Sequence, residues 1–278
     1  SYANHRNGRP QRPRPKELEK MDHVAALAKK LWQARCDGGV VDPADVRAPE
    51  SDVEAYAVQD EIVRLSGLPG RGFKVGSTSA EAQKLLGTSE PGSCPVLAPY
   101  YFESPAKIKL VPDHMPALEG EFAFRLGHDL PPREAVYSEA EVRDAIDAIA
   151  GAIEVVGTRL KGGLAGKGRY LVTADSGANI ALAVGAWQTD WRDLDLKAHM
   201  VTMHVNGAAK GSGPGARALG DPVNVMIWLA NQQSRRGRGL KAGDVVSTGT
   251  CTGLDPVAPG DQVTADFGTL GSVDISFE

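Results

Sequence analysis

Cysteine is scarce in this chain, and its few copies lie far apart. The 278 residues contain three cysteines, Cys36, Cys94 and Cys251, and none of them belongs to a Cys-x-x-Cys pair. An odd number of widely spaced cysteines argues against a disulfide framework, and the missing pairs argue against a zinc knuckle. We therefore expect a protein of the reducing cytoplasm.

Long apolar runs are missing as well. No segment approaches the roughly 20 consecutive apolar residues of a transmembrane helix, and the N-terminus has no apolar core of a signal peptide. The sequence also lacks a Gly-x-Ser-x-Gly nucleophile elbow, and Gly166-Lys167 is not followed by the Ser or Thr of a phosphate-binding loop. We expect neither a membrane partner nor a phosphate-binding loop.

Positive charge is concentrated at the N-terminus. Residues 1–20 hold six basic side chains against two glutamates, whereas the whole chain has a net charge of −4. The rest of the chain is therefore acidic, which argues against a nucleic-acid partner. Proline and charge together, as in the Arg-Pro-Arg-Pro run at 12–15, oppose a packed core. We predict a disordered, basic, proline-rich tail over residues 1–20.

Helical patterns follow this tail. Apolar residues recur at helical spacing from Asp22 to the glycine pair at 38–39, and again over residues 52–65. Because the two patterns are adjacent and short, we predict a small helical N-terminal cap over residues 21–69.

Strand patterns dominate the remaining residues, 70–278. They do not alternate with helices, which favours an α+β protein with an antiparallel or mixed sheet curled on itself. Within this part we expect a long loop over residues 87–105 and a helix over residues 139–150, followed by an apolar strand.

The most informative stretch is an acidic strand at residues 118–124, Leu-Glu-Gly-Glu-Phe-Ala-Phe. Alternation along a strand places Glu119 and Glu121 on one face and the two phenylalanines on the other. Glu154 is a single acid in another apolar strand pattern, and a lone buried carboxylate is costly. Three carboxylates around one point suit a hard divalent cation such as Mg²⁺ or Mn²⁺. A solvated acidic face is the alternative that the pattern leaves open.

Three further positions carry groups suited to catalysis. Lys74 lies between two apolar residues in a strand pattern, and burial would lower its pKa and favour proton transfer. A lysine whose stem reaches the surface is an equal alternative. Asp175, within a run of small residues, on its own indicates a turn or a helix cap. Thr248-Gly249 closes an apolar strand with amides and a hydroxyl that suit a carboxylate, and it is equally a common turn.

Several spaced motifs agree with one known family. They are Gly-Phe-Lys-Val-Gly-Ser-Thr at 72–78, Pro-Ala-Leu-Glu-Gly-Glu at 116–121, Ile-Glu-Val-Val-Gly-Thr-Arg at 153–159, Ala-Asp at 174–175, Leu-Gly-Asp-Pro at 219–222 and Thr-Gly at 248–249. In this order they resemble the fumarylacetoacetate hydrolase superfamily, in its 2-keto-4-pentenoate hydratase and 4-oxalocrotonate decarboxylase branch. The resemblance runs from about residue 24 to the C-terminus.

The resemblance implies a mixed β-sandwich roll, the fold of that family's C-terminal domain, behind a small helical N-terminal region. The roll would form a catalytic domain over residues 70–278. A homo-oligomer is expected, with Mg²⁺ or Mn²⁺ as cofactor. The implied site residues are Lys74 and Asp175 for catalysis, Thr78, Arg159, Thr248 and Gly249 for substrate binding, and Glu119, Glu121 and Glu154 for the metal.

The implied reaction is the metal-dependent hydration of a 2-hydroxy-2,4-dienoate, a small 2-oxo or dienoic acid. The substrate ketonises, water adds at C4, and the metal-bound enolate is protonated to give a 4-hydroxy-2-oxo acid. Lys74 would be the proton shuttle or oxyanion partner, and Asp175 would position water or orient Lys74.

Two alternatives accompany this prediction. Residues 174–178 lack the Arg-Asp pair of hydrolase members, which favours hydratase or decarboxylase chemistry over C–C hydrolysis. A decarboxylase of the 4-oxalocrotonate type would need a basic residue for a second carboxylate, and Arg159, Lys161 and Arg169 are the candidates. The second alternative is a non-catalytic small-acid-binding protein, in which the three glutamates hold a structural metal or none.

Overall fold

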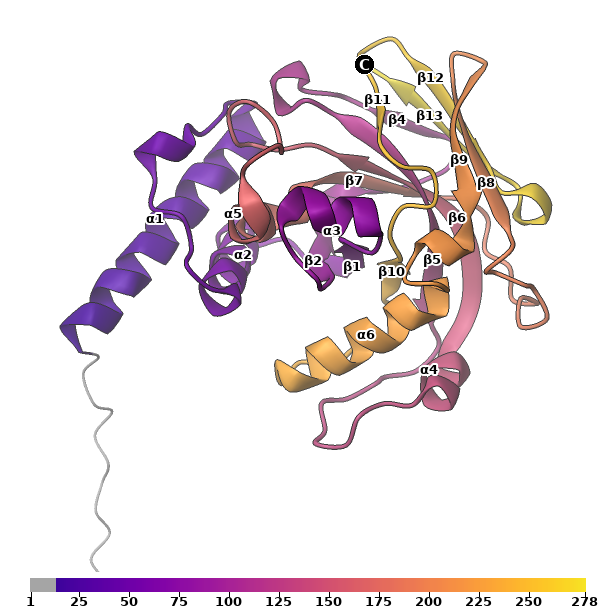
Figure 1. Cartoon of the computed structure of the whole chain (residues 1–278), viewed down its shortest axis with the longest axis horizontal. Coiled ribbons are helices and arrows are strands. Elements are labelled where there is room, and N and C mark those ends of the chain that lie inside the picture. The colour runs from indigo at the N-terminus through magenta and orange to yellow at the C-terminus, as the bar shows by residue number, and fades with distance from the viewer. Residues whose placement is uncertain (1–13) are drawn as a thin grey trace, which may run out of the picture.

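The computed structural model of the protein describes residues 14–278, which form two sheets flanked by helices (Figure 1). The larger sheet has the strand order β2-β1-β10-β5-β6-β7-β3, and β11 also pairs with β5. Its strands are β1 (Gly70–Gly76), β2 (Gly92–Leu97), β3 (Tyr101–Glu103), β5 (Ala117–Leu126), β6 (Ile146–Val156), β7 (Asn179–Val184), β10 (Val245–Ser247) and β11 (Asp255–Pro256). The smaller sheet has the order β4-β13-β12-β8-β9. Its strands are β4 (Ala106–Ile108), β8 (Met200–Val205), β9 (Ala208–Pro214), β12 (Gln262–Asp266) and β13 (Ser272–Phe277).

Both sheets are mixed. Strands β1 and β10, β3 and β7, and β4 and β13 pair in parallel, whereas β5 and β6 pair antiparallel over their whole length. This arrangement confirms the predicted α+β class and the mixed β-sandwich roll. The helices are α1 (Pro15–Asp37), α2 (Asp52–Ser66), α3 (Ala80–Leu86), α4 (Glu139–Ala145), α5 (Gly168–Ala174) and α6 (Pro222–Arg235). Over residues 14–278, none of the helices is both long and apolar enough to cross a membrane.

The main core fills the space between the two sheets. Alternation along β5 sends Phe122 and Phe124 to this side, where both are fully buried. Phe122 meets Phe267 edge to face at 5.8 Å between ring centroids, and Phe124 meets Trp191 in the same way at 5.7 Å. Such aromatic pairs add about 0.5–1.5 kcal/mol each beyond the area that they bury. The buried phenylalanines therefore fix which face of β5 is turned away from the smaller sheet.

That opposite face of β5 and β6 carries small and acidic residues. Glu119, Glu121 and Ala123 alternate with the phenylalanines, as predicted. In the antiparallel register, Glu119 lies directly opposite Glu154 of β6, and Glu121 lies opposite Ala152. Directly opposed residues on one face have Cβ atoms about 4.5–5.5 Å apart. The strand register therefore brings the three glutamates together.

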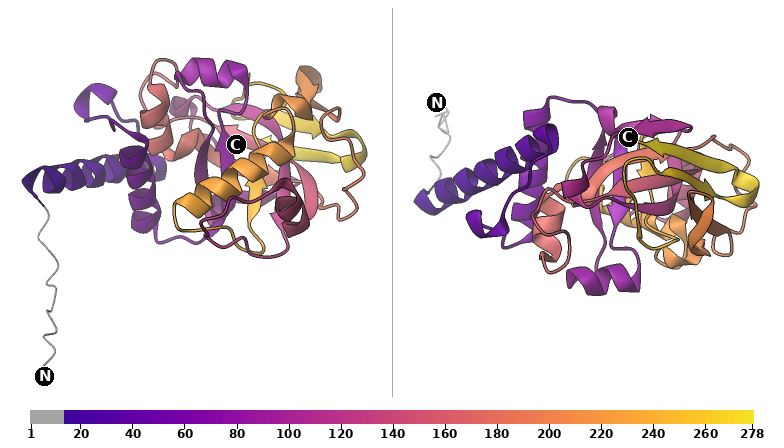
Figure 2. Two further views of the ribbon diagram at one scale, coloured as in Figure 1. Left: turned by 60° about the horizontal axis from the view of Figure 1, so that its bottom comes forward. Right: turned by 90° about the horizontal axis from the view of Figure 1, so that it is seen from above.

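Helices α1 and α2 lie at the end of the molecule opposite the smaller sheet (Figure 2). Their buried apolar residues, including Leu31 and Val58, form one cluster with Leu160 and with Leu171 of α5. The N-terminal helices are thus packed onto the segments that follow β6. The division into a cap of residues 21–69 and a catalytic domain of residues 70–278 stays a prediction.

The predicted tail is too long. Helix α1 begins at Pro15, so residues 15–20 are helical, whereas residues 1–13 lie outside the described part of the chain. Proline suits the first position of a helix, because the amide that it lacks would have no partner there in any case. Lys20 then pairs with Glu54 of α2 at 3.1 Å, a contact between helices that local composition does not reveal.

Two element predictions in the second part are also wrong. The expected helix over residues 139–150 ends at Ala145, and residues 146–150 already belong to β6. The apolar residues there suit either element, and pairing with β5 decides for the strand. The expected loop over 87–105 contains β2 and β3. Because a proline disfavours a strand prediction, Pro95 made the residues of β2 resemble a loop. The proline is tolerated there because β2 is an edge strand.

We expect Gly151→Ala to lower the free energy of unfolding by about 1–3 kcal/mol, the usual cost of overpacking a core. A Cβ atom at this position of β6 would overlap the ring of Phe267, which is completely buried. Urea denaturation of the purified variant measures the change.

Gly70→Ala is the matched control. The nearest atom to a Cβ there is the carbonyl oxygen of Val96 at 4.0 Å, so we expect a change within about 0.5 kcal/mol. Equal stability of Gly151→Ala and wild type would show that Phe267 does not pack against β6 as described.

Candidate metal centre

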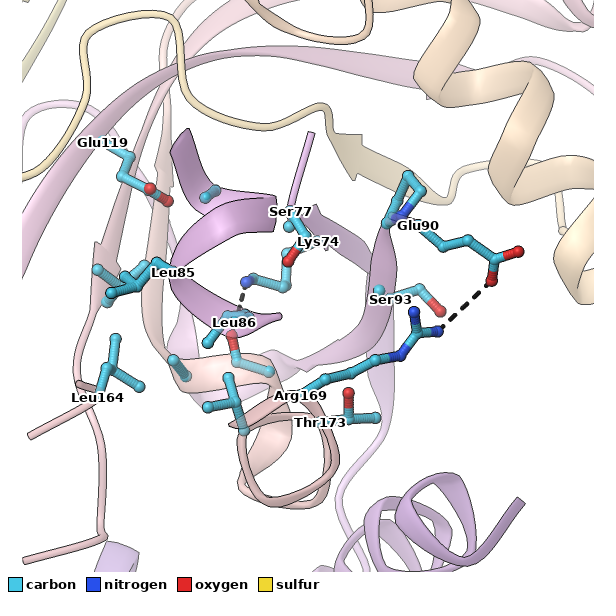
Figure 3. A pocket seen from close by; sticks show the side chains of 18 of the residues that line it. Lys74, Ser77, Leu85, Leu86, Glu90, Ser93, Glu119, Leu164, Arg169 and Thr173 are labelled. Atoms are coloured by element: carbon cyan, nitrogen blue, oxygen red, sulfur yellow. Dashed lines mark hydrogen bonds and ion pairs between the residues drawn. The ribbon is translucent and has the colours of Figure 1, made fainter. Parts of the chain in front are cut away.

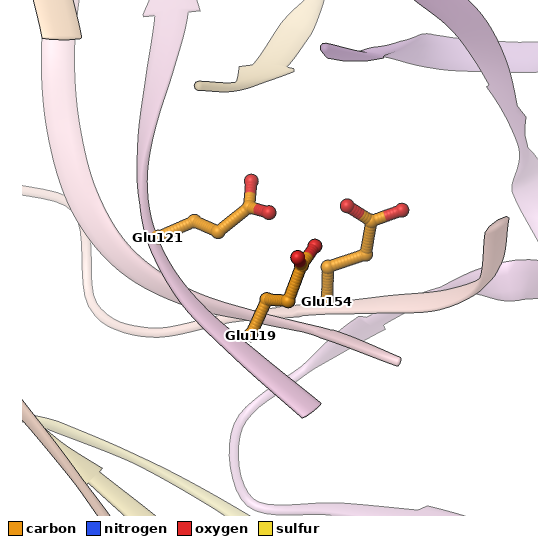
Figure 4. Close-up of side chains that lie close together, drawn as sticks. All are labelled: Glu119, Glu121 and Glu154. Atoms are coloured by element: carbon orange, nitrogen blue, oxygen red, sulfur yellow. The ribbon is translucent and has the colours of Figure 1, made fainter. Parts of the chain in front are cut away.

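Three glutamates converge on the face of the larger sheet that is turned away from the smaller one. Glu119, Glu121 and Glu154 each offer a carboxylate oxygen, and these oxygens lie within 4.8 Å of one another. Figure 4 shows the three side chains pointing toward a shared space from two neighbouring strands. Glu121 and Glu154 are fully buried, and Glu119 is partly buried. The predicted convergence is therefore present.

Burial and mutual repulsion make these groups hard to ionise together. Burial, reinforced by the charge of Glu154, raises the pKa of Glu119 to about 7. Burial and the charges of Glu154 and Glu119 raise the pKa of Glu121 well above its ordinary value. Each carboxylate thus destabilises the charged form of another, unless a cation offsets the charge.

The hydrogen bonds of this cluster leave room for a cation. Oε2 of Glu121 accepts from the Ser247 hydroxyl and from the Gly249 amide at 2.9 Å, and Oε1 of Glu154 accepts from the Asn179 side-chain amide at 3.1 Å. The remaining oxygens, Oε1 of Glu121 and Oε2 of Glu154, are buried and have no hydrogen-bond partner among residues 14–278. Unpaired buried oxygens are rare and need an explanation. Hard oxygen ligands in this number fit Mg²⁺ or Mn²⁺.

Lys74 of β1 lies beside this cluster. Its Nζ is 3.3 Å from Oε1 of Glu154 and donates a 2.7 Å hydrogen bond to the carbonyl of Gly177. Burial alone would lower its pKa, but the charges of Glu154, Glu119 and Glu121 outweigh this effect, and the pKa is raised. Burial has the predicted effect, but the expected net lowering of the pKa of Lys74 is wrong, because the neighbouring carboxylates raise it more. The side chain is a protonated ammonium and acts first as a donor.

The turn that receives Lys74 has an unusual backbone. Ser176, Gly177 and Ala178 all have positive φ angles, of 54°, 60° and 63°. For a residue other than glycine, this left-handed conformation costs about 1–3 kcal/mol. The turn is held where α5 ends, and it directs the Gly177 carbonyl at the ammonium. Strain of this kind is typical of functional sites.

Asp175 precedes this turn and binds Arg159. Its Oδ1 accepts from Nε of Arg159 at 2.7 Å, and its Oδ2 accepts from the Thr158 hydroxyl at 2.6 Å and from the Arg159 amide at 2.9 Å. Asp175 is buried with these partners. Asp175 does not contact Lys74 directly. The turn that contains Gly177 connects the two residues, and so do the contacts that run through Arg159, Asn179 and Glu154.

Arg159 is likewise committed to protein oxygens. Its Nη1 donates to the carbonyl of Asn179 at 2.8 Å, and its Nη2 donates to the carbonyl of Asp175 at 2.6 Å. The guanidinium is fully buried, and Arg159 is not among the described residues that line the pocket beside the glutamates. These contacts count against the predicted role of Arg159 in substrate binding. They place it as a support for the segment from Asp175 to Asn179.

The three remaining predicted residues lie together on the other side of Glu121. Gly249 donates its amide to Glu121, and it contacts Thr78 so closely that a Cβ on Gly249 would overlap the threonine side chain. The Thr248 hydroxyl donates to the carbonyl of Phe122 at 2.9 Å, which ties β5 to the end of β10. Thr248 and Gly249 thus hold the metal centre itself. The Thr78 hydroxyl is buried without a partner among the described residues, so it keeps a free group for a ligand.

Two residues that the sequence did not predict, Ser247 and Asn179, orient the glutamates. Ser247 is the parallel partner of Lys74 in the sheet, and it binds Glu121. Asn179 binds Glu154, and its own carbonyl oxygen accepts a 2.8 Å hydrogen bond from Arg35 of α1. Ser247 adjoins the Thr-Gly motif, which is a weak local signal. Arg35 lies 144 residues from Asn179 in the chain, and the sequence contains no signal for that pair.

A pocket leads from the metal centre to the surface (Figure 3). Lys74 and Glu119 line it together with Ser77, Gly177 and Ala178. Glu119 is therefore accessible to a small molecule from the side on which Lys74 lies, whereas Glu121 and Glu154 lie buried behind it.

We expect the affinity for Mg²⁺ to fall as the pH falls through about 7. The pKa of Glu119 is raised to about 7 and that of Glu121 is raised well above its ordinary value, so at lower pH these carboxyls become protonated and neutral. A cation must then displace protons, whereas at higher pH it meets ionised ligands. Isothermal titration calorimetry at pH 6 and pH 8, in buffers of different ionisation enthalpy, measures affinity and released protons. Equal affinity at both pH values, without proton release, would contradict this expectation.

Comparison with known proteins agrees with this geometry. A 2-keto-4-pentenoate hydratase of Paraburkholderia xenovorans (strain LB400) is 31% identical to the chain over 256 residues, covering 90% of this chain and 93% of the relative. A 2-oxo-hept-4-ene-1,7-dioate hydratase of Escherichia coli is 30% identical over 259 residues, covering 90% and 96%. The solved 4-oxalocrotonate decarboxylase from Pseudomonas putida G7, complexed with magnesium and adipate, superposes with a TM-score of 0.82 at 26% identity, over 96% of this chain and 100% of that chain.

The family model described as "Fumarylacetoacetate (FAA) hydrolase C-terminal" matches residues 83–277, which is more than half of the chain. This match includes the three glutamates, Asp175 and the Thr248-Gly249 turn. It confirms the resemblance that the spaced motifs indicated. The chain belongs to the fumarylacetoacetate hydrolase family.

Proposed function

We propose that this protein is a divalent-metal-dependent hydratase, a hydro-lyase. It adds water to a 2-hydroxy-2,4-dienoate, or to the corresponding 2-oxo-alkenoate, and releases a 4-hydroxy-2-oxo acid. The observation that carries this proposal is the convergence of Glu119, Glu121 and Glu154 beside the buried ammonium of Lys74. The two hydratases at 30–31% identity over nearly the whole chain support it.

The three glutamates would hold the cation, each through an oxygen that faces the shared space. A divalent cation bound there supplies a Lewis acid for the carboxylate and keto oxygens of a 2-oxo acid. Ser247, Gly249 and Asn179 fix the other oxygens of Glu121 and Glu154, so the ligands are oriented before the cation arrives. The fixed ligands position a substrate next to Lys74.

Lys74 would carry the protons. In ketonisation its ammonium gives a proton to C5 of the dienol, and the resulting amine takes one from the enol hydroxyl. In hydration the amine takes a proton from the water that adds at C4, and the ammonium gives one to C3 of the enolate. Each step restores the ammonium, which the surrounding carboxylates favour. The carbonyl of Gly177 keeps Nζ in place between the two steps.

The other predicted site residues have supporting roles in this scheme. Thr78 would bind the carboxylate end of the substrate with its unpaired hydroxyl. Asp175 would act as a positioning residue, because it anchors Arg159 and the strained turn that holds Lys74. Thr248 and Gly249 would act on the substrate through Glu121 and β5 rather than by direct contact.

We expect Glu121→Gln to abolish both metal binding and turnover, with a loss of more than about 100-fold in kcat/KM. The amide has no negative charge, and its single oxygen cannot both face the cation and accept from Ser247 and Gly249. Loss of the ultraviolet absorbance of a 2-hydroxy-2,4-dienoate, with and without Mg²⁺ or Mn²⁺, measures turnover, and calorimetry measures metal binding.

The control is Glu103→Gln, at the exposed end of β3, which should leave both quantities unchanged. Metal-independent turnover by Glu121→Gln would refute the scheme. Metal binding by the wild type without turnover of any dienoate or 2-oxo acid would favour a non-catalytic acid-binding protein.

We also propose that the protein is a cytoplasmic homo-oligomer. All three cysteines are free thiols, the form that a reducing compartment maintains.

Large apolar side chains are exposed on the N-terminal helices, with Leu18 47%, Met21 61% and Val53 81% exposed. A second copy of the chain would cover them. Light scattering after size exclusion should give a mass that is a multiple of 29.4 kDa, and a constant mass of 29.4 kDa would refute the oligomer.

A further inference from the structure

The outer part of the pocket beside the metal centre is apolar. Leu85 and Leu86 of α3, Leu164, Val172 of α5 and Leu254 line it, in addition to the catalytic residues. Figure 3 shows Leu85 and Leu164 on the same side of the pocket as Glu119. Leu85 and Leu254 are about half exposed, so this apolar wall reaches the surface. A substrate held at Glu119 by its 2-oxo acid end would extend along these side chains.

One cation besides Lys74 lines the pocket within residues 14–278, and it is Arg169 of α5. Its Nε and Nη2 bind both oxygens of Asp52 at 2.8 and 3.1 Å, and its Nη1 donates to the Thr88 hydroxyl. Nη2 is also 3.6 Å from Glu90, the pair that Figure 3 shows as a dashed line. Three of its five N–H groups make these hydrogen bonds, and its positive charge is shared between two carboxylates.

The other basic residues that could bind a distant carboxylate are engaged elsewhere. Arg159 is buried in its pair with Asp175. Lys161 is exposed and pairs with Asp42 at 3.2 Å, and neither residue is among the described residues of the pocket lining. A second carboxylate on the substrate would meet the apolar wall, Ser77, Ser93, Thr173 and the carboxylate of Glu90. Among the described lining residues it would find no cation that lacks a carboxylate partner. Desolvating an unpaired carboxylate is strongly unfavourable.

We propose, on the basis of the hydratase function above, that the substrate is a monocarboxylic acid whose far end is an apolar alkyl or aryl group. The apolar wall binds the alkyl or aryl end of the substrate. In the Asp52–Arg169–Glu90 cluster the guanidinium is already paired with two carboxylates, so a second carboxylate of the substrate has no free cation to bind. The two related hydratases differ in this respect, because one is named for a monocarboxylate and the other for a 1,7-dioate. The proposal also argues against decarboxylation of a dicarboxylic substrate such as 4-oxalocrotonate.

Binding of a matched pair of stable acids to the Mg²⁺-loaded protein tests this inference. 2-Oxohexanoate and 2-oxoadipate share the 2-oxo acid end and the carbon count, and they differ in a terminal methyl or carboxylate. We expect calorimetry to show 2-oxohexanoate binding at least about tenfold more tightly. Equal or tighter binding of 2-oxoadipate would overturn the inference and leave the hydratase function standing. Binding of neither acid would instead refute the 2-oxo acid site, and the inference with it.

Variants at the cluster provide a second measurement. In the double variant Asp52→Asn, Glu90→Gln the guanidinium of Arg169 loses both negative partners. We expect 2-oxoadipate to gain at least about fivefold in affinity while 2-oxohexanoate stays within about twofold. Glu61→Gln, which removes an acid paired with Arg64 on the surface of α2, is the control and should change neither.

The variant Arg169→Met tests whether Arg169 binds a second carboxylate of the substrate or serves only its protein partners. If Arg169 bound a second carboxylate in the wild type, the variant would lose affinity for 2-oxoadipate alone. The inference expects no such selective loss, because the guanidinium already serves Asp52, Thr88 and Glu90. A selective loss would overturn it.

Discussion

Electrostatic repulsion between three carboxylates is the constraint on which this structure depends. Glu119, Glu121 and Glu154 are brought together by the register of β5 and β6, and burial removes the water that would screen them. Two of their oxygens have no hydrogen-bond partner within the described residues. A divalent cation resolves the repulsion and the missing contacts together, because it supplies positive charge where the oxygens converge. The chemistry of the site follows from this single requirement.

The surrounding segments hold each group in one orientation. Ser247 and Gly249 bind Glu121, and Asn179 binds Glu154, so only the free oxygens face the shared space. The positive charge of Lys74 partly balances the negative charge of the three glutamates. That negative charge raises the pKa of Lys74 and keeps its ammonium protonated. The N-terminal helix α1 takes part through Arg35, whose guanidinium binds Asn179. The helical region therefore supports the metal centre in addition to packing beside the sheet.

Different parts of the pocket serve the proposed reaction and the selection of the substrate. Lys74 and Glu119 line its inner part, and in the proposed reaction they would act with Glu121 and Glu154 on the 2-oxo acid end of the substrate. The outer end is formed by α3, α5 and Leu254, segments that lie outside the strands carrying the glutamates. Because different segments build the two ends, the outer wall can change in polarity while the metal centre stays the same.

Local sequence alone determined the faces of the acidic strand, since alternation on β5 separates the glutamates from Phe122 and Phe124 whatever the rest of the chain does. The spaced motifs likewise identified the family, and the acidic strand pattern predicted that the three glutamates converge. Only the tertiary structure decided that residues 146–150 form a strand, because their apolar spacing suits a helix equally well until β5 pairs with them. It also decided that Arg159 supports Asp175 and that the pKa of Lys74 rises, since both depend on charges distant in sequence. Periodicity is a local property, whereas register, ion pairing and burial arise only when distant segments meet.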